Sequence, residues 1–130
     1  MAMAIGEDPR IVCLCGSTKF LSAFEIANRD ETLEGRIVLT IGVDLKFRDI
    51  DFLEASKSLA EIEAIKDRLD WLHKRKIDKA SEILVLDIDG PDKLGDSTKS
   101  EIAYAREKDK TVRFWSEERK STPSKATTGS

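Results

Sequence analysis

Apolar and polar positions follow one another along the chain in blocks that predict alternating strands and helices. Short runs that are almost continuously apolar are typical of strands buried on both faces, whereas apolar residues three or four positions apart predict amphipathic helices. The predicted strands span 10–16, 36–42, 82–88 and 111–115, and the predicted helices span 17–35, 57–80 and 97–109. Residues 43–56 have no clean period and are predicted to form a loop or an irregular segment.

Strands that alternate with helices predict an α/β fold, in which one parallel sheet carries helices on both faces. Right-handed crossovers join the strands of such sheets, and ligands bind outside the carboxyl ends of the strands. We therefore expect functional residues in the segments that follow the first three strands, which are 16–19, 42–51 and 87–101.

The length of 130 residues fits a single domain. We expect that domain over residues 10–116, between a flexible N-terminus (1–9) and a disordered tail (117–130) that is almost free of apolar residues. A net charge of −3 lacks the basic excess of a nucleic-acid binder, so no nucleic-acid partner is expected. No apolar run approaches the roughly 20 residues that cross a bilayer, and the N-terminus has no signal-peptide pattern, which favours a cytoplasmic location.

The two cysteines, Cys13 and Cys15, lie two positions apart in the first predicted strand and should point to the same face. Cysteines placed in this way are badly oriented for a disulfide with each other. With one histidine in the chain and no C-x-x-C pair, no metal site is expected. We therefore expect two buried, reduced thiols.

The turn after the first strand, Gly16-Ser17-Thr18-Lys19, combines a glycine, two hydroxyl side chains and a positive charge. The free amides at the start of the following helix attract anions, which favours a phosphate or sugar site. A plain helix cap by Ser17 or Thr18 explains the same residues, and the two interpretations stay open. From the second loop, Arg48 is a candidate contact to the substrate.

Glu101 lies in the stretch GDSTKSEIAYA, residues 95–105. If Thr98 is the N-cap of the helix, Glu101 completes a T-x-x-E capping box, and if Ser97 is the cap, Glu101 lies one position further in. Helical side chains lean toward their own N-terminus, so Glu101 also points back toward the crevice at the strand ends. The pattern alone favours the cap over a catalytic carboxylate.

Two further polar residues are candidates for chemistry. His73 follows Leu69 by four positions and therefore lies on or beside the apolar stripe of the longest helix. A lone histidine in such a place is most often a satisfied residue at the edge of the core. Asp87 ends the third strand, where it can accept hydrogen bonds from sugar hydroxyls or assist proton transfer, or form an Asx turn at the start of the loop.

Three motifs together, CGSTKF, LHKRKIDKASEILVLD and GDSTKSEIAYA, resemble the nucleoside 2-deoxyribosyltransferase superfamily, which includes the deoxynucleoside 5′-monophosphate N-glycosidases. The likeness spans residues 10 to about 115, and the last motif is the most specific. It implies a flavodoxin-like fold with four to five strands in the order 2-1-3-4. It also implies cleavage of an N-glycosidic bond without a cofactor, and a homodimer formed through the 57–80 helix.

The resemblance assigns roles to individual residues. It implies that Glu101 is the nucleophile and that Gly16, Ser17 and Thr18, with Lys19, hold the sugar or phosphate. It further implies phosphate binding at the turn before the catalytic glutamate, which comprises Gly95, Asp96, Ser97 and Thr98. The family's general acid is an aspartate near the end of the preceding helix, and His73 stands at that place here, so the acid is His73 or a nearby group.

The expected function is therefore an N-glycosidase that acts on a ribo- or deoxynucleoside 5′-monophosphate, with Asp87 orienting the sugar hydroxyls. Three alternatives stay open. A deoxyribosyltransferase would pass the sugar to a second base, a nucleotide-binding module would use Glu101 only as a cap, and an interaction domain would have a vestigial cleft.

Overall fold

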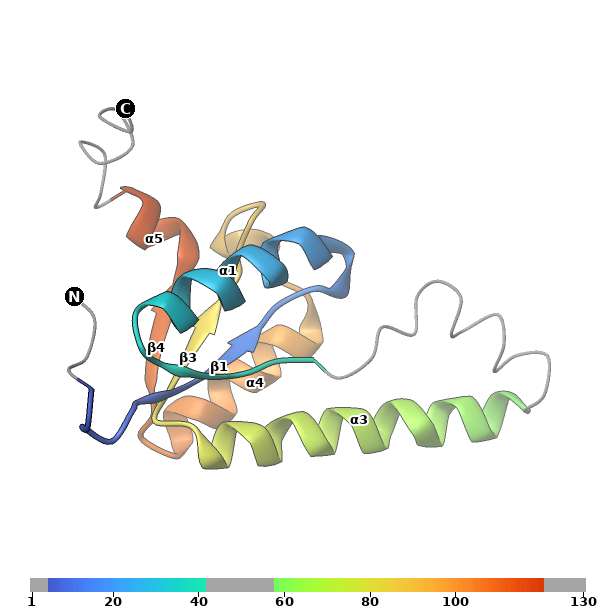
Figure 1. The fold of residues 1–130 in the computed structure, drawn as a ribbon. Helices are drawn as coiled ribbons and strands as arrows, with labels where there is room; N and C mark the ends of the chain where they lie inside the picture. Colours follow the sequence, from blue (N-terminus) through green and yellow to red (C-terminus); the bar gives the residue numbers. More distant parts are fainter. Residues whose placement is uncertain (1–4, 42–57, 121–130) are drawn as a thin grey trace.

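The computed structural model describes residues 5–41 and 58–120, which form an α/β fold of the flavodoxin-like type (Figure 1). Within these residues the sheet has four parallel strands in the order β2-β1-β3-β4, as predicted. The strands are β1 (Ile11–Cys15), β2 (Ile37–Leu39), β3 (Glu82–Val85) and β4 (Thr111–Phe114). The helices are α1 (Leu21–Leu33), α3 (Leu59–Lys79), α4 (Asp96–Glu107) and α5 (Trp115–Lys120), and two 3₁₀ helices span Thr18–Phe20 and Pro91–Lys93.

The sheet has a separate apolar core on each face, because successive residues of a strand point to opposite sides. In β1, Val12 and Leu14 pack on the face covered by α1, together with Trp115 at the start of α5. Cys13 and Cys15 lie on the other face, under α3 and α4. The prediction that the two cysteines share one face is confirmed, and both thiols are free and buried.

The predicted strands and helices are present with shorter bounds. The strand predicted over 36–42 covers only Ile37–Leu39. The helix predicted over 17–35 begins with the 3₁₀ helix Thr18–Phe20, whose first turn is capped by the Ser17 hydroxyl, and becomes α-helical at Leu21. The loop predicted over 43–56 lies outside the described residues.

Helix α5 corrects the prediction of a disordered tail from residue 117, since it continues to Lys120. Two contacts stabilise it, and the first of them is to a residue far away in the sequence. The Ser116 amide and hydroxyl donate hydrogen bonds of 2.8 and 2.6 Å to the two oxygens of Asp87, and Arg113 donates two hydrogen bonds of 2.7 and 3.0 Å to Glu118. The composition of the segment after residue 116 does not reveal the contact with Asp87. Residues 121–130 lie outside the described part of the chain.

Buried charges connect α1, β3 and β4. Arg113 of β4 donates hydrogen bonds of 2.8 and 3.0 Å to the two oxygens of Glu31, a residue of α1 that is only 6% exposed. Arg36 lies 3.2 Å from Glu31 and 3.4 Å from the buried Glu82 at the start of β3. Buried carboxylates are costly unless they are paired, so the two arginines permit α1 and the sheet to pack at this place.

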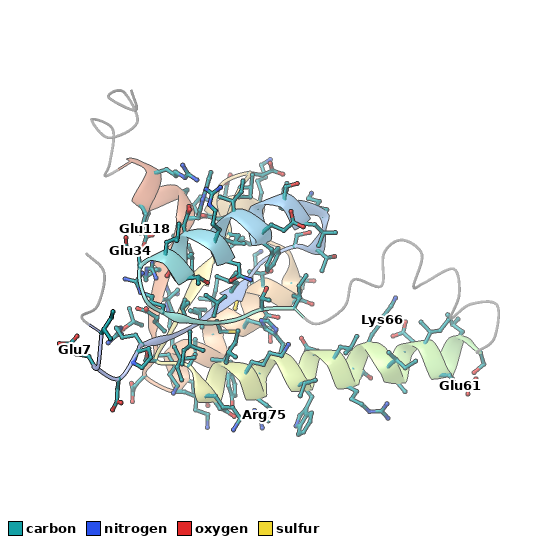
Figure 2. The ribbon with its side chains drawn as sticks, in the orientation of Figure 1. Glu7, Glu34, Glu61, Lys66, Arg75 and Glu118 are labelled. Atoms are coloured by element: carbon teal, nitrogen blue, oxygen red, sulfur yellow. The ribbon has the colours of Figure 1, made fainter. Side chains whose placement is uncertain are left out.

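Helix α3 lies across one side of the molecule, and its amino-terminal half extends past the edge of the sheet (Figure 1). It begins with a capping box, in which the Glu61 amide donates to the Ser58 hydroxyl at 3.2 Å and the Ser58 amide donates to the Glu61 carboxylate at 2.7 Å. Figure 2 shows Glu61 at the tip of this helix and Arg75 near its other end. Among the described residues, no helix is long and apolar enough to cross a membrane.

Candidate active site

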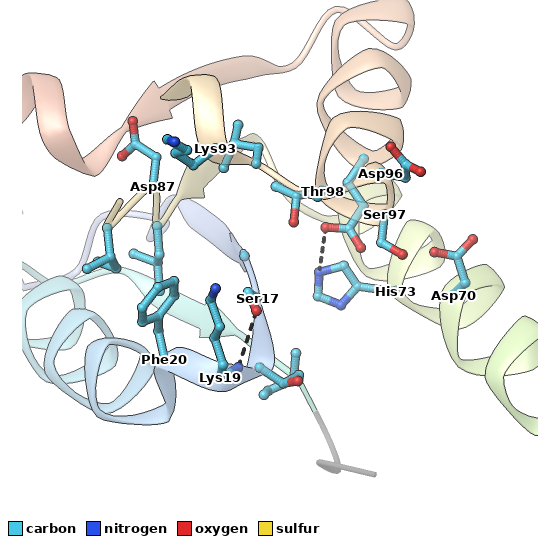
Figure 3. Close-up of a pocket in the computed structure, with 18 of the residues that line it drawn as sticks. Ser17, Lys19, Phe20, Asp70, His73, Asp87, Lys93, Asp96, Ser97 and Thr98 are labelled. Atoms are coloured by element: carbon cyan, nitrogen blue, oxygen red, sulfur yellow. Dashed lines mark hydrogen bonds and ion pairs between the residues drawn. The ribbon is translucent and has the colours of Figure 1, made fainter. Parts of the chain in front are cut away.

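The carboxyl ends of β1 and β3 open into a cleft of about 820 Å³, within the range of about 300–1,000 Å³ that is typical of small-molecule sites. Its walls come from the turn after β1, one side of α3, and the segment that leads from β3 into α4 (Figure 3). Two of the predicted segments, 16–19 and 87–101, supply residues to this cleft. The third, 42–51 with Arg48, lies outside the described residues.

The turn after β1 is shaped by close packing at Gly16. A Cβ at this position would lie 3.2 Å from the Leu86 Cβ atom and 3.3 Å from the Leu86 carbonyl oxygen, tighter than ordinary contact. The Ser17 hydroxyl accepts a hydrogen bond of 3.3 Å from the Lys19 amide, so the cap interpretation of Ser17 is confirmed. The Lys19 ammonium lies 3.9 Å from Asp89, and both side chains are more than half exposed, which places this positive charge at the rim.

Helix α4 begins beside the cleft with Gly95 as its N-cap, which offers no side-chain hydrogen bond. The amides of the first helical turn, from Asp96 to Thr98, have no partner within the helix. Both Ser97 and Thr98 border the cleft in Figure 3, and Thr98 is buried. An anion in the cleft would therefore meet free amides and the positive end of a helix dipole.

Glu101 is not a helix cap. Because Gly95 is the N-cap, Glu101 is the sixth residue of α4, and the predictions of a cap at Thr98 or Ser97 are both wrong. The side chain is 11% exposed and lines the cleft. Burial raises the pKa of this carboxyl group, and the positive charge of protonated His73 acts in the opposite direction. The capping motif that explained Glu101 without a substrate is absent.

His73, labelled in Figure 3, lies beside Glu101 at the wall of the cleft, with its Nε2 atom 4.0 Å from the Glu101 Oε1 atom. The same nitrogen lies 3.1 Å from the Leu14 carbonyl oxygen and 3.6 Å from the sulfur of each cysteine. Burial lowers the pKa of the imidazole, but a hydrogen bond to the Cys13 thiolate and the negative charges of Cys13 and Glu101 raise it overall. His73 is therefore more than an edge residue of the core, since it joins two thiols to the cleft.

The two thiols differ in acidity. The hydrogen bond from Cys15 lowers the pKa of Cys13 to about 6, against the effect of burial and with the help of His73. The same hydrogen bond, together with burial, raises the pKa of Cys15. A negative charge in this cluster is thus placed on Cys13, beside the imidazole.

Asp87 does not present its carboxylate to His73 or Glu101. It is 1% exposed, and its two oxygens accept the hydrogen bonds from Ser116 at the start of α5. Figure 3 shows it on the side of the cleft away from His73. The turn that follows is closed by the Asp87 backbone carbonyl, which accepts from the Gly90 amide at 3.0 Å, so the side chain forms no Asx turn. The geometry thus gives Asp87 a positioning role for α5 and does not support the predicted contact to sugar hydroxyls.

Asp70 lines the cleft and was missed by the sequence analysis. It precedes His73 by three positions on α3, which puts both side chains on one face of the helix. Its carboxylate lies 3.5 Å from the Lys74 ammonium and is partly exposed. The sequence signal that could have identified Asp70 is its spacing of three positions before His73. Lys93 also borders the cleft and adds a positive charge on the β3–α4 side.

No protein-family model matches the chain, and no curated protein sequence matches it at a significant level. The likeness to the nucleoside 2-deoxyribosyltransferase superfamily therefore rests on the three sequence motifs.

Replacing Asp87 or Ser116 with Ala should each lower the free energy of unfolding by about 1.5–3 kcal/mol, the usual range for hydrogen bonds to a charged group. The two losses should be less than additive, because both substitutions remove the hydrogen bond from the Ser116 hydroxyl to Asp87, while the bond from the Ser116 amide is lost only with Asp87. Urea unfolding of the wild type, the two single variants and the double variant measures this coupling. Strictly additive losses would contradict the contact between Asp87 and α5.

Proposed function

We propose that the protein is an N-glycosidase that hydrolyses the bond between base and sugar in a ribo- or deoxynucleoside 5′-monophosphate, with Glu101 as the nucleophile. The observation that carries the proposal is the place of Glu101, a mostly buried carboxylate at the wall of the cleft with an imidazole 4.0 Å away. The capping role that competed with catalysis is excluded by the position of Glu101 in α4.

The chemistry requires a carboxylate beside the anomeric carbon. Cleavage passes through an oxocarbenium-like transition state, which a negative charge stabilises and can trap as a glycosyl ester. In the first step the Glu101 oxygen bonds to C1′ while the C1′–N bond breaks and the base leaves with a proton. In the second step water attacks C1′ and the bond from C1′ to Glu101 breaks, so that Glu101 is released as a carboxylate and the proton of the water returns to the acid that protonated the base. No redox change occurs in either step.

The proton for the departing base comes from the α3 side of the cleft in this proposal. His73 is the first candidate because its Nε2 atom adjoins Glu101, and its raised pKa favours the protonated form. Asp70, one helical turn earlier on the same face, is the alternative donor. A positioned acid of this kind contributes about 10²–10⁴-fold to the rate.

The 5′-phosphate is proposed to bind at the start of α4. The amides of Asp96, Ser97 and Thr98 supply donors there, and Lys19 and Lys93 supply positive charge around the cleft. This arrangement favours a nucleotide over an uncharged nucleoside. A deoxyribosyltransferase remains the alternative, and it would be recognised by a free base that accelerates turnover.

We also propose a homodimer through α3, which follows from the resemblance. The support in the structure is that Leu59, Trp71 and Leu72 of this helix are 76%, 56% and 42% exposed. Sedimentation equilibrium would show a monomer throughout if this part of the proposal is wrong.

Base release from a panel of ribo- and deoxynucleoside monophosphates, followed by chromatography, tests the proposed activity. Glu101→Gln keeps the shape of the side chain but removes the charge, and it should lower kcat by at least about 10³-fold. The matched control is Glu107→Gln, at the end of the same helix, which should keep wild-type activity. No release from any substrate, or equal activity of the Glu101 variant with an unchanged circular dichroism spectrum, would overturn the proposal.

The role of His73 can be separated from a structural role by changing the leaving group. His73→Asn should lower kcat about 10²–10⁴-fold on an ordinary purine nucleotide. It should cost no more than about tenfold on the N7-methylated analogue, whose base leaves without protonation. Equal losses on both substrates would exclude His73 as the acid. The same pattern in Asp70→Asn would assign the proton to Asp70.

A further inference from the structure

Behind the wall of the cleft, side chains from three elements converge on one point. Cys13 and Cys15 come from β1, His73 from α3 and Glu101 from α4. The two sulfurs and the His73 ring nitrogen all lie within 4.8 Å of one another, and all three residues are buried. The Glu101 carboxylate closes the group on the cleft side, 4.0 Å from the same nitrogen.

The hydrogen bonds from the two thiols to the backbone are long. The backbone acceptors of the Cys13 and Cys15 thiols are 3.9 and 4.0 Å away, at the limit of contacts to sulfur. The His73 Nε2 atom carries at most one proton, yet it has the Leu14 carbonyl oxygen, two sulfurs and a carboxylate oxygen within 4.0 Å. Two sulfur atoms and two oxygen atoms therefore compete for the single proton that Nε2 can carry.

The spacing fits tetrahedral coordination of a thiophilic cation. With Zn–S bonds of about 2.3 Å and Zn–N bonds of about 2.0–2.1 Å, tetrahedral angles place sulfur and nitrogen about 3.6 Å apart. Both sulfur–nitrogen distances in the structure are 3.6 Å. The same geometry requires a nitrogen–oxygen distance of about 3.4 Å, which the Glu101 carboxylate reaches from 4.0 Å by a small change of side-chain torsion.

We propose that Cys13, Cys15 and His73 bind one thiophilic divalent cation of the zinc class, with a Glu101 oxygen as the fourth ligand. This proposal replaces the expectation of no metal site, which depended on the absence of a C-x-x-C pair. A C-x-C pair on a strand serves equally well, because the strand's period of two puts both sulfurs on one face. The other two ligands lie far from this pair in the sequence, since His73 is 58 residues from Cys15 and Glu101 comes later still.

Binding must displace protons, since metal ligands are deprotonated. Cys13 binds as the thiolate, Cys15 gives up its thiol proton, and the His73 ring loses the proton on Nε2 and keeps the one on Nδ1, so that the Nε2 lone pair meets the cation. The contact between Nε2 and the Leu14 carbonyl oxygen is then lost. Two thiolates and one carboxylate leave a charge of −1 on the loaded site, which the positive charge of Lys76, close enough to affect Cys13 and His73, partly balances.

A cation at this site would occupy the same carboxylate and imidazole that the proposed N-glycosidase uses. This consequence rests on the proposed function: the loaded protein would be inactive, and removal of the metal by a chelator would restore activity. The binding site itself does not depend on that function, because its ligands are defined by distance and chemistry.

Titration of the reduced, full-length protein with Co²⁺ tests the site directly. We expect saturation at one Co²⁺ per chain, with thiolate-to-cobalt charge-transfer absorption and the intense visible bands of tetrahedral cobalt, while the far-ultraviolet circular dichroism stays unchanged. Zn²⁺ should then displace Co²⁺ and abolish the bands. Absence of the charge-transfer band in the folded wild-type protein would overturn the proposal.

Variants identify the ligands. Cys15→Ser and His73→Asn should each weaken Co²⁺ binding by more than about 100-fold, beyond the 10–100-fold typical of a lost outer-shell partner. Glu101→Gln should keep the charge-transfer band and change the visible bands. Asp70 lies in the cleft but outside the cluster. Asp70→Asn is therefore the matched control, and it should bind Co²⁺ as the wild type does. If Cys15→Ser does not fold, equilibrium dialysis of the wild-type protein against Zn²⁺ decides the question, and clearly less than one bound Zn²⁺ per chain at saturation overturns the site.

The two proposals fail in different ways. Base release that depends on Glu101, together with no thiolate band, would overturn the metal site and leave the glycosidase standing. A thiolate band in the titration, with no base release from any nucleotide by the chelator-treated, metal-free protein, would overturn the glycosidase and support the metal site.

Discussion

Burial of β1 on both of its faces is the constraint on which the rest of the structure depends. A parallel strand covered on both sides has to place alternate residues in two different cores, and here Val12 and Leu14 enter one core while Cys13 and Cys15 enter the other. Helices α3 and α4 close over the cysteine side. They bring His73 and Glu101 into a place where polar groups are costly unless they are partnered, so the four side chains become partners of one another.

The side of the cleft away from His73 is organised by contacts that hold the sheet and its helices together. Asp87 has the position expected of a ligand-binding carboxylate, yet both of its oxygens are taken by Ser116. Arg113 connects Glu31 and Glu118, so β4, α1 and α5 are joined by one guanidinium group. These contacts stabilise the frame of the sheet, and the cleft is left to the turn after β1, to α3 and to the start of α4.

Much of the fold could be predicted because its signals are local. The apolar runs of β1 and β3 and the helical spacing in α3 and α4 are visible in the sequence, and the predicted strand order is confirmed. The start of α4 could not be predicted, since Gly95, Asp96, Ser97 and Thr98 are all residues that favour N-caps, and their order does not say which one takes the role. The three positions between Gly95 and Thr98 decide whether Glu101 is a capping residue or a cleft residue.

Contacts between distant residues account for the other failures. Helix α5 has a polar sequence, and its stability comes from Asp87, 29 residues away from Ser116. The meeting of His73 with Cys13, 60 residues apart, has no signature in composition or spacing. The prediction of two buried, reduced thiols is confirmed, but the local pattern of the strand carries no information on the side chains of α3 and α4 that pack against it.

Trapping the glycosyl ester tests most directly whether Glu101 is the nucleophile. The protein is quenched with acid during the first turnover of a cleaved nucleotide, digested with trypsin and analysed by mass spectrometry. Cleavage after Lys99 and Arg106 yields the peptide SEIAYAR, in which Glu101 is the only acidic side chain. If Glu101 is the nucleophile, this peptide gains the mass of the sugar phosphate. A burst of released base with no modified protein, or with the sugar phosphate on another peptide, would contradict it.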